Sequence, residues 1–374
     1  MKPPQWLGAG ILASVAAIVL ALMLIPDFGP EPILIRGHVG NLKVPYFENP
    51  EVQRILRDKY GLVVEVNGMA TTEMLCPGDP ATLDGVDFLL AGEMSQVATY
   101  EECQNRQDPY KPVFLSPMVI YSWADTIDAL VKIGVASQDE SGAYHVDMLE
   151  LLELMESDTT WEDLGLAGRP SQIFVHVTDP QRSSSGGTFS GLLANTMNCV
   201  EVVDSKTVEP VLPRIFTYYQ GVGYLEPSSE ALFRSYLTQG EGARPLVALL
   251  ESQLSDYLYA NPDDADAVAQ MVRMLYPTPT VWTSHPFIAR TELGEQLMDA
   301  MLDPELQQLG WEITGFRPSV PGVDIEVANS VVPGILPVIT SVIDLPSKQI
   351  LDLIKAATTT QPPDSRVPQR DCAA

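Results

Sequence analysis

Residues 178–193, TDPQRSSSGGTFSGLL, bring together residue types that bind anions at the start of a helix. They follow the β-branched run 173–177, IFVHV, and lead into an apolar run with helical spacing from Phe189. The first turn of a helix has backbone N–H groups without intrahelical partners, and its dipole favours negative charge. Serine hydroxyls add donors, and glycines let a ligand approach the backbone closely. An anion or carboxylate is therefore well placed at 183–187, unless one serine merely caps the helix and the others fill a flexible turn.

Other polar residues carry two interpretations each. Lys43 could neutralise an anionic ligand or be a solvated loop lysine. The Arg182 guanidinium suits oxyanions, but it could pair with Asp179 instead. We interpret His38 and His285, which follow apparent strands into turns, as structural histidines.

The composition excludes some partners and suggests more than one core. The chain has 374 residues, of which 45% are hydrophobic, and this length favours two lobes plus appendages. It carries 49 Asp and Glu against 22 Lys and Arg, for a formal net charge of -27. Such a surface repels phosphate backbones, so we predict no nucleic-acid partner.

An uncharged apolar run, LGAGILASVAAIVLALMLI at residues 7–25, is long enough to cross a bilayer as a helix. It lacks a small-residue cleavage site, which favours a retained single-pass anchor over a cleaved signal peptide. Lys2 stays inside in either case. We therefore predict a cell-membrane protein with an extracytoplasmic soluble part, the alternative being secretion after cleavage.

Four cysteines then lie in an oxidising compartment, where disulfides form. Cys76 and Cys103 lie in loop-like sequence of the same lobe and are the candidate disulfide, with unpaired thiols as the alternative. No Cys/His cluster has zinc spacing, and we predict neither a metal site nor a cofactor.

The N-terminal half begins with a β-α-β pattern. Residues 33–37 read as a buried strand, Asn49-Pro50 as a helix start, Gly61 as the helix end, and 62–66 as a second strand. This order implies a parallel sheet with a right-handed crossover. Residues 87–92 resemble a third strand.

Two proline-broken extended runs, 112–123 and 279–289, indicate where the chain passes between lobes. Helical patterns are expected at 125–133, 147–155, 229–236 and 265–275, and helix starts at Thr291 and Asp303. The fold class is thus α/β, with an inserted second lobe, two hinge crossings and an N-terminal transmembrane helix. The predicted boundaries are 1–30 for the anchor or signal, 31–120 for the first part of lobe 1, 121–278 for lobe 2, 279–355 for the rest of lobe 1 with a C-terminal helix, and 356–374 for a disordered tail.

The opening stretch, extended to TDPQRSSSGGTFSGLLAN, resembles the DP-x-x-S-x-S-G turn of type II periplasmic solute-binding proteins, including those for sulfate, molybdate, phosphate and iron. Residues 35–66, 218–240 and 276–318 resemble a bacterial extracellular solute-binding group. The resemblance runs from about residue 33 to 318, and the order of its motifs is its strongest feature.

That resemblance implies two α/β lobes that close on a ligand by hinge bending. It also implies ligand contacts on three stretches of the chain, namely Gly40, Asn41, Lys43, Ser183, Ser184, Ser185, Gly186, Gly187, Thr188, Tyr219 and Tyr224. The expected partners are a small anionic or polar ligand, an ABC-type permease as its receiver, and the membrane.

Two other classes of function remain open at this stage. A serine hydrolase would need Ser185 or Ser190 to meet His176 or His285, although the sequence has no GxSxG elbow. A membrane-anchored sensor or scaffold would keep the fold with a degenerate cleft. A polar, partly positive cleft favours solute capture, whereas a cleft filled by apolar side chains favours the scaffold. We predict a solute-binding protein without catalysis.

Overall fold

The computed structural model describes residues 31–323, 325, 332, 334–363, 368 and 372. The apolar run 7–25, for which the sequence predicts a membrane anchor or a signal peptide, lies outside the described residues. Among the residues that are described, no helix is both long and apolar enough to span a membrane.

The predicted β-α-β unit opens the first lobe. The strands β1 (Ile33–Val39) and β2 (Leu62–Gly68) pair in parallel. Between them, Asn49 caps α3 (Pro50–Tyr60) by accepting two first-turn N–H groups, and Gly61 ends the helix at a φ of 66°. A left-handed residue costs least when it is glycine, so both ends of this helix follow from the sequence.

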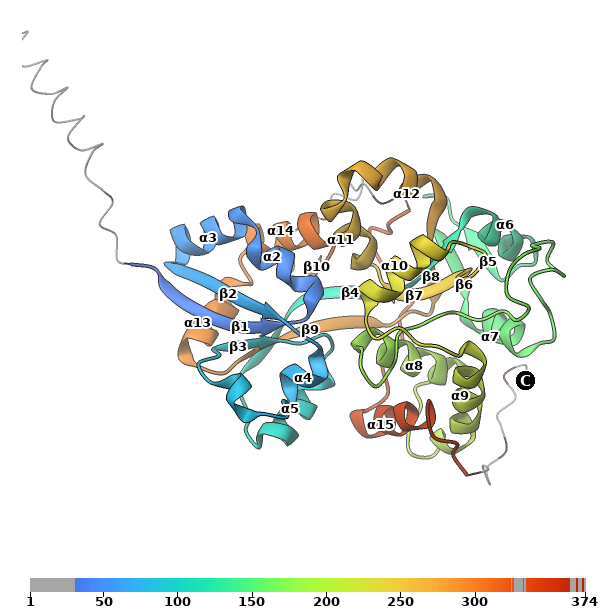
Figure 1. Cartoon of the computed structure of the whole chain (residues 1–374), viewed down its shortest axis with the longest axis horizontal. Coiled ribbons are helices and arrows are strands. Elements are labelled where there is room, and N and C mark those ends of the chain that lie inside the picture. The colour runs from blue at the N-terminus through green and yellow to red at the C-terminus, as the bar shows by residue number, and fades with distance from the viewer. Residues whose placement is uncertain are drawn as a thin grey trace, which may run out of the picture.

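The two lobes lie side by side, and the chain passes between them (Figure 1). Lobe 1 contains β1, β2, β3 (Phe88–Leu90), the first part of β4 (Tyr110–Trp123), β9 (Trp282–Ala289), β10 (Arg317–Pro318), η1 (Asn41–Lys43), α2 (Val44–Glu48), α3, α4 (Thr71–Leu75), η2 (Pro80–Leu83), α5 (Gln96–Gln104), α13 (Glu292–Ala300) and α14 (Pro304–Thr314). Lobe 2 contains the rest of β4, β5 (Ala136–Gln138), β6 (Tyr144–Asp147), β7 (Leu246–Leu250), β8 (Val272–Thr278), α6 (Ala124–Lys132), α7 (Met148–Glu156), α8 (Ser184–Met197), α9 (Val208–Val222), α10 (Ser229–Gln239), α11 (Ser252–Ala260), η3 (Pro262–Asp264), α12 (Ala265–Met271) and α15 (Lys348–Ala357).

One long strand, β4, belongs to both lobes. Its first part pairs with β9 and its second part with β7 and β8, all antiparallel. The strands follow the order β2-β1-β3-β9-β4-β8-β6-β5, while β10 and β7 also pair with β4. The crossings predicted at 112–123 and 279–289 thus correspond to β4 and to the passage from β8 into β9.

The C-terminal helix differs from the predicted arrangement. Helix α15 packs on α8 and α9, and its Ile350 and Ile354 are buried in the core of lobe 2. The chain therefore passes to lobe 2 again after β10, beyond the two crossings that were predicted. The periodicity of α15 indicated an apolar face, but it carried no information about which lobe would cover that face.

Two local predictions were also wrong. Residues 173–177 form no regular strand, and only isolated bridges join His176 to Val247 and Thr178 to Glu226. The helix predicted at 265–275 ends at Met271, because the following residues pair with β4 and β6 as strand β8.

The opening serine and glycine run is also more helical than expected, because α8 begins at Ser184. A Cβ on Gly186 would lie 2.3 Å from the Thr178 carbonyl oxygen, and one on Gly187 would lie 2.7 Å from Cε of Lys355. The glycines therefore serve close packing inside the first helical turn.

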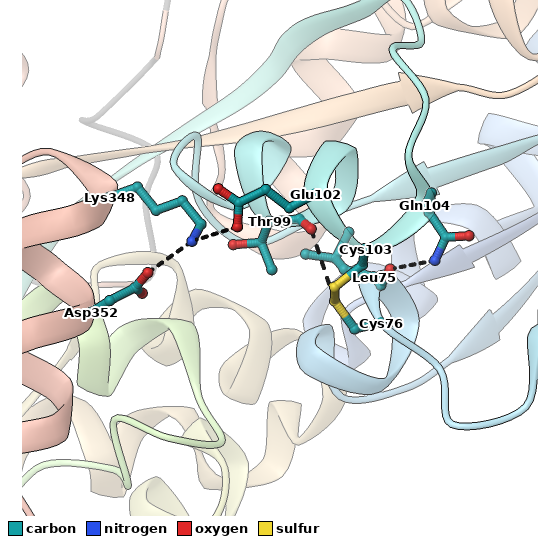
Figure 2. The surroundings of a disulfide bond; sticks show 8 residues. All are labelled: Leu75, Cys76, Thr99, Glu102, Cys103, Gln104, Lys348 and Asp352. Atoms are coloured by element: carbon teal, nitrogen blue, oxygen red, sulfur yellow. Dashed lines mark hydrogen bonds and ion pairs between the residues drawn. A yellow bond between two sulfur atoms is a disulfide. The ribbon is translucent and has the colours of Figure 1, made fainter.

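Two disulfides hold peripheral segments. Cys76, at the end of α4, is bonded to Cys103 of α5, which is the pair that the sequence indicated (Figure 2). Cys199 is bonded to Cys372, 173 residues further on. The predicted disordered tail at 356–374 thus starts inside α15, and Cys372 is attached to lobe 2.

Candidate functional site

A cavity between the lobes collects most of the predicted polar residues. Its volume is about 110 Å³. It is lined by Gly40, Asn41, Leu42, Lys43, Met69, Ala70, Thr71, Gly92 and His285 of lobe 1, and by Arg182, Ser183, Ser184, Ser185, Pro227, Ser228, Ser229, Glu230 and Leu250 of lobe 2. Polar groups from both lobes therefore face one shared space.

Lys43 provides the positive charge on the lobe 1 wall. After β1 the chain turns at Gly40 into η1, where the Lys43 N–H donates to the Gly40 carbonyl oxygen at 2.9 Å. Lys43 is only 3% exposed, and its side chain makes no hydrogen bond or ion pair with any described residue. Its Nζ lies 5.5 Å from the centroid of the Phe316 ring. Lys43 is thus a buried ammonium group whose three donors are free within the described chain.

Burial also changes the proton affinity of this lysine. It lowers the pKa of Lys43 to about 7, because the ammonium loses its hydration, and the nearby Glu230 carboxylate opposes this shift. A negative ligand in the cavity would favour the charged form and raise the pKa again. Anion binding in this cavity would therefore be coupled to protonation of Lys43.

The N-terminus of α8 forms the opposite wall. Ser183 occupies the N-cap position without a side-chain capping bond, and its hydroxyl lies 3.0 Å from Oγ of Ser185 instead. The Ser185 hydroxyl also contacts those of Thr178 at 3.0 Å and Ser229 at 2.8 Å. Because the serines bond to one another, the first amide groups of α8 remain available for an anion.

A second helix start, that of α10, lies beside the first. The Ser229 hydroxyl connects it to Ser185, and the Ser228 side chain caps it by accepting the Ala231 N–H at 3.2 Å. Glu230, in the first turn of α10, lines the cavity. The site thus contains a carboxylate as well as cations.

His285 contributes a neutral ring to the lobe 1 wall. It is 1% exposed, and neither ring nitrogen makes a hydrogen bond of normal geometry with a described residue. Burial, with a smaller contribution from Lys43, holds the pKa of His285 well below its ordinary value, although the Ala91 backbone opposes this. We interpreted this residue as a satisfied structural histidine, whereas its ring lies beside the cavity with only the Ala91 backbone as a weak partner.

The lobes contact each other directly next to the cavity. Nε2 of Gln96 donates to Oγ of Ser184 at 2.8 Å, and the Ser184 hydroxyl lies 3.4 Å from that of Thr71. A Cβ on Gly92 would lie 2.4 Å from Oγ of Ser184, so the approach requires glycine there. Figure 2 shows a further contact, in which Lys348 of α15 meets Glu102 of α5 at 2.9 Å. The lobes are therefore closed onto one another.

The predicted contact residues divide into two groups. The structure brings Gly40, Asn41, Lys43 and Ser183–Ser185 to the cavity lining. Gly186, Gly187 and Thr188 lie further into α8, outside that lining. Tyr219 is buried in lobe 2 with its hydroxyl 2.6 Å from Oγ of Ser190, and Tyr224 is 71% exposed.

Sequence reasoning missed Thr71, Gly92 and Glu230, and it favoured an ion pair for Arg182. Arg182 lines the cavity and makes no ion pair with a described residue, Asp179 included. Ser228-Ser229-Glu230 carried a helix-start pattern that could have indicated a second anion-binding helix end. Thr71 and Gly92 have no local pattern, because only the folded β1–β3 edge brings them to the site.

The same geometry bears on metals and on the hydrolase alternative. Within the described residues, no group of three or more His, Cys, Asp and Glu side chains could hold a metal ion. The His176 ring accepts a hydrogen bond from Arg244 at 2.8 Å, and the Ser190 hydroxyl bonds to the Gly186 carbonyl at 2.8 Å. Neither residue is arranged as a nucleophile and base.

Comparisons with known proteins give a fold. No protein-family model and no curated protein sequence matches the chain. A periplasmic thiamin binding protein has a TM-score of 0.58 at 11% identity, over 90% of this chain and 97% of its own. Trichodesmium FutA with iron and citrate has a TM-score of 0.56 at 14% identity, over 87% of this chain and 98% of its own. Iron-bound HitA from Pseudomonas aeruginosa has a TM-score of 0.55 at 13% identity, over 87% of this chain and 99% of its own.

These likenesses show the fold. The chain has the two-lobed α/β fold of the type II periplasmic solute-binding proteins, which the motif order predicted. By their titles, one of these neighbours is a thiamin binding protein, one is a complex with iron and citrate, and one is iron-bound; each is covered over nearly its whole length.

Proposed function

We propose that this protein is an extracytoplasmic solute-binding protein that captures a small anionic or polar ligand between its lobes and delivers it for transport. The observation that carries the proposal is Lys43, a lysine 3% exposed that faces the cavity without an ion-pair partner in the described chain. Desolvating an unpaired ammonium destabilises a protein, so such a group is typical of a binding site.

Ligand capture would use donors from both lobes. Lys43 supplies charge from lobe 1, and the uncapped amides of α8 and the Arg182 guanidinium supply donors from lobe 2. Because these groups converge only when the lobes meet, binding favours the closed arrangement. The neighbours titled as thiamin and iron binding proteins make transport the natural context.

The membrane part of the proposal concerns residues 7–25. We infer that this run anchors the protein, with its lobes outside the cytoplasmic membrane and an ABC-type permease as the receiving partner; secretion after signal cleavage is the alternative. Membrane fractionation with and without carbonate extraction distinguishes the two, since only an integral anchor stays in the pellet.

The charged cavity favours capture over the sensor or scaffold alternative, for which we expected an apolar cleft. The absence of catalysis fits the neutral His285 and the hydroxyl contacts of Ser185, which involve only other hydroxyls. The proposal therefore assigns binding and no chemical step.

The test is a thermal-shift screen of the soluble lobes with sulfate, phosphate, molybdate, short carboxylates, ferric citrate and thiamin, followed by titration calorimetry. A ligand that binds only the folded state raises the melting temperature. We expect at least one shift that Lys43→Met abolishes. Lys111→Met is the matched control, because Lys111 lies on the surface of the same lobe and pairs with Asp299 at 2.6 Å. The proposal fails if no compound shifts the wild-type protein.

A further inference from the structure

Two opposite charges line the cavity without contacting each other. Lys43 comes from lobe 1 and Glu230 from lobe 2. They interact electrostatically, yet they form no ion pair within 4 Å, and neither makes a side-chain hydrogen bond or ion pair with another described residue. If Glu230 only neutralised Lys43, the closed lobes would bring the two groups into contact. Each group is therefore open to a ligand in the cavity.

The acidic side of the cavity has a second carboxyl group nearby. Burial and the Glu230 charge raise the pKa of Asp256, on α11, to about 7. Near neutral pH Asp256 therefore holds a proton much of the time. The first turn of α10 favours a negative side chain, so Glu230 is stabilised there without a basic partner.

The neutral His285 ring adds an acceptor. Its nitrogens are buried without hydrogen bonds of normal geometry, and a neutral imidazole offers one lone pair. A carboxylate such as Glu230 suits an ammonium group, which carries only donors. Lys43, Arg182 and the α8 amides supply only donors, and they suit an anionic oxygen group.

We propose that the ligand is a small zwitterion, with its anionic oxygen group held by Lys43, Arg182 and the start of α8, and its ammonium group held by Glu230. This inference rests on the proposed solute-binding function and names the ligand class for that site. The cavity volume is about 110 Å³, which suits a small molecule whose two charged ends lie within reach of both walls.

The test compares ligands that differ by the ammonium group alone. Titration calorimetry at pH 7 uses β-alanine against propionate, taurine against ethanesulfonate, and O-phosphoethanolamine against ethyl phosphate, with sulfate and phosphate as simple anions. In at least one pair we expect the zwitterion to bind about tenfold more tightly or better, since a hydrogen bond to a charged group has that value.

Variants assign the preference to Glu230. Glu230→Gln should reduce the discrimination within that pair to about threefold or less, while the matched anion binds as well as before or better. Glu292→Gln is the matched control, because Glu292 is an exposed acidic residue in the first turn of α13, away from the cavity. It should leave the preference unchanged. Circular dichroism and melting temperature establish that each variant is folded.

The unfavourable outcomes are distinguishable. If the anion binds as tightly as its zwitterion in every pair, or only sulfate or phosphate binds, the ligand is a plain anion; this inference is then wrong and the proposed function stands. If Glu230→Gln keeps the full preference, Glu230 does not hold the ammonium and the inference is also wrong. If no compound in this set or in the wider screen binds, both proposals fail.

Discussion

The interlobe cavity and the hinge, by which we mean the region where β4 pairs with β10 and with β7, each contain a buried cation. The cation of the hinge has a partner in the described chain, and that of the cavity has none. Arg317, on β10, is 4% exposed and donates to both carboxylate oxygens of Glu251, at 2.6 and 2.8 Å. The Tyr276 hydroxyl donates to the same carboxylate. Lys43 is 3% exposed and has no such partner in the described chain. The fold thus provides an opposite charge for the buried Arg317, whereas the Lys43 side chain remains open to a ligand.

The contrast predicts the largest loss of stability at the hinge. Arg317→Met leaves the fully buried Glu251 carboxylate without its cation, and we expect the free energy of unfolding to fall by about 3–5 kcal/mol. Urea denaturation followed by circular dichroism measures it. The double variant Arg317→Met/Glu251→Gln should recover part of the loss. A loss below about 1 kcal/mol would mean that the ion pair does not secure the hinge.

The same substitution type should have the opposite effect in the cavity. At pH 6 Lys43→Met removes a desolvated ammonium, so we expect the free energy of unfolding to rise by about 1–3 kcal/mol. Urea denaturation of the ligand-free protein measures it. Lys111→Met, at a solvated ion pair, should change stability by less than about 1 kcal/mol. If Lys43→Met is the less stable protein, Lys43 has a structural partner after all.

This difference should depend on pH with a definite sign. The folded lysine releases its proton near pH 7, whereas the unfolded lysine keeps it up to about pH 10.5. The unfolded state therefore binds more protons in this window, and the wild type gains stability relative to Lys43→Met by up to about 1.4 kcal/mol per pH unit. Parallel urea denaturation series from pH 6 to 9 measure the difference in the free energy of unfolding between the wild type and Lys43→Met. A difference independent of pH would show that Lys43 titrates normally.

Anion binding should weaken over the same range, because the neutral lysine attracts no anion. Calorimetric affinity for the best ligand of the screen should fall as the pH rises above 7. In Lys43→Met, whatever affinity remains should lack that dependence on pH.

A smaller effect is expected where the lobes touch. Ser184→Ala removes the hydrogen bond from Gln96, and we expect a loss of about 0.5–1.5 kcal/mol together with a larger radius of gyration by X-ray scattering. Ser205→Ala, an exposed serine of lobe 2, is the control. Unchanged scattering would indicate that the hinge alone sets the closed arrangement.

The smallest effect belongs to the peripheral contact in Figure 2. Glu102 is 65% exposed, and Lys348 also pairs with Asp352 at 2.7 Å. Solvent screens such a pair, so Glu102→Gln should change stability by about 1 kcal/mol or less. A loss as large as that of Arg317→Met would reverse the contrast between paired and solvated charges.

Much of the fold could be predicted from local chemistry. Asn49-Pro50 and Gly61 mark the ends of α3, and Asp303-Pro304 marks the start of α14, because capping depends on residues adjacent in sequence. The strand predicted at 173–177 failed because its apolar residues face the lobe 2 core without a regular ladder. Burial of a β-branched run favours extended backbone, but it does not supply a neighbouring strand.

The site was predictable only in part for the same reason. Lys43 and the serines of α8 belong to short motifs that can be identified in one stretch of sequence. Glu230 and His285 reach the cavity through helix packing and sheet order, which bring together positions far apart in the chain. Likewise, no residue close to Arg317 in the sequence indicates that it pairs with Glu251, 66 residues earlier.

The bond between Cys199 and Cys372 turns the second half of the chain into a covalent ring that includes β8, β9 and α15. A protease that cuts once at any surface loop inside this ring leaves both fragments joined, and the molecule migrates as one piece until a reductant separates them. Such a ring would let the nicked protein keep both of its lobes.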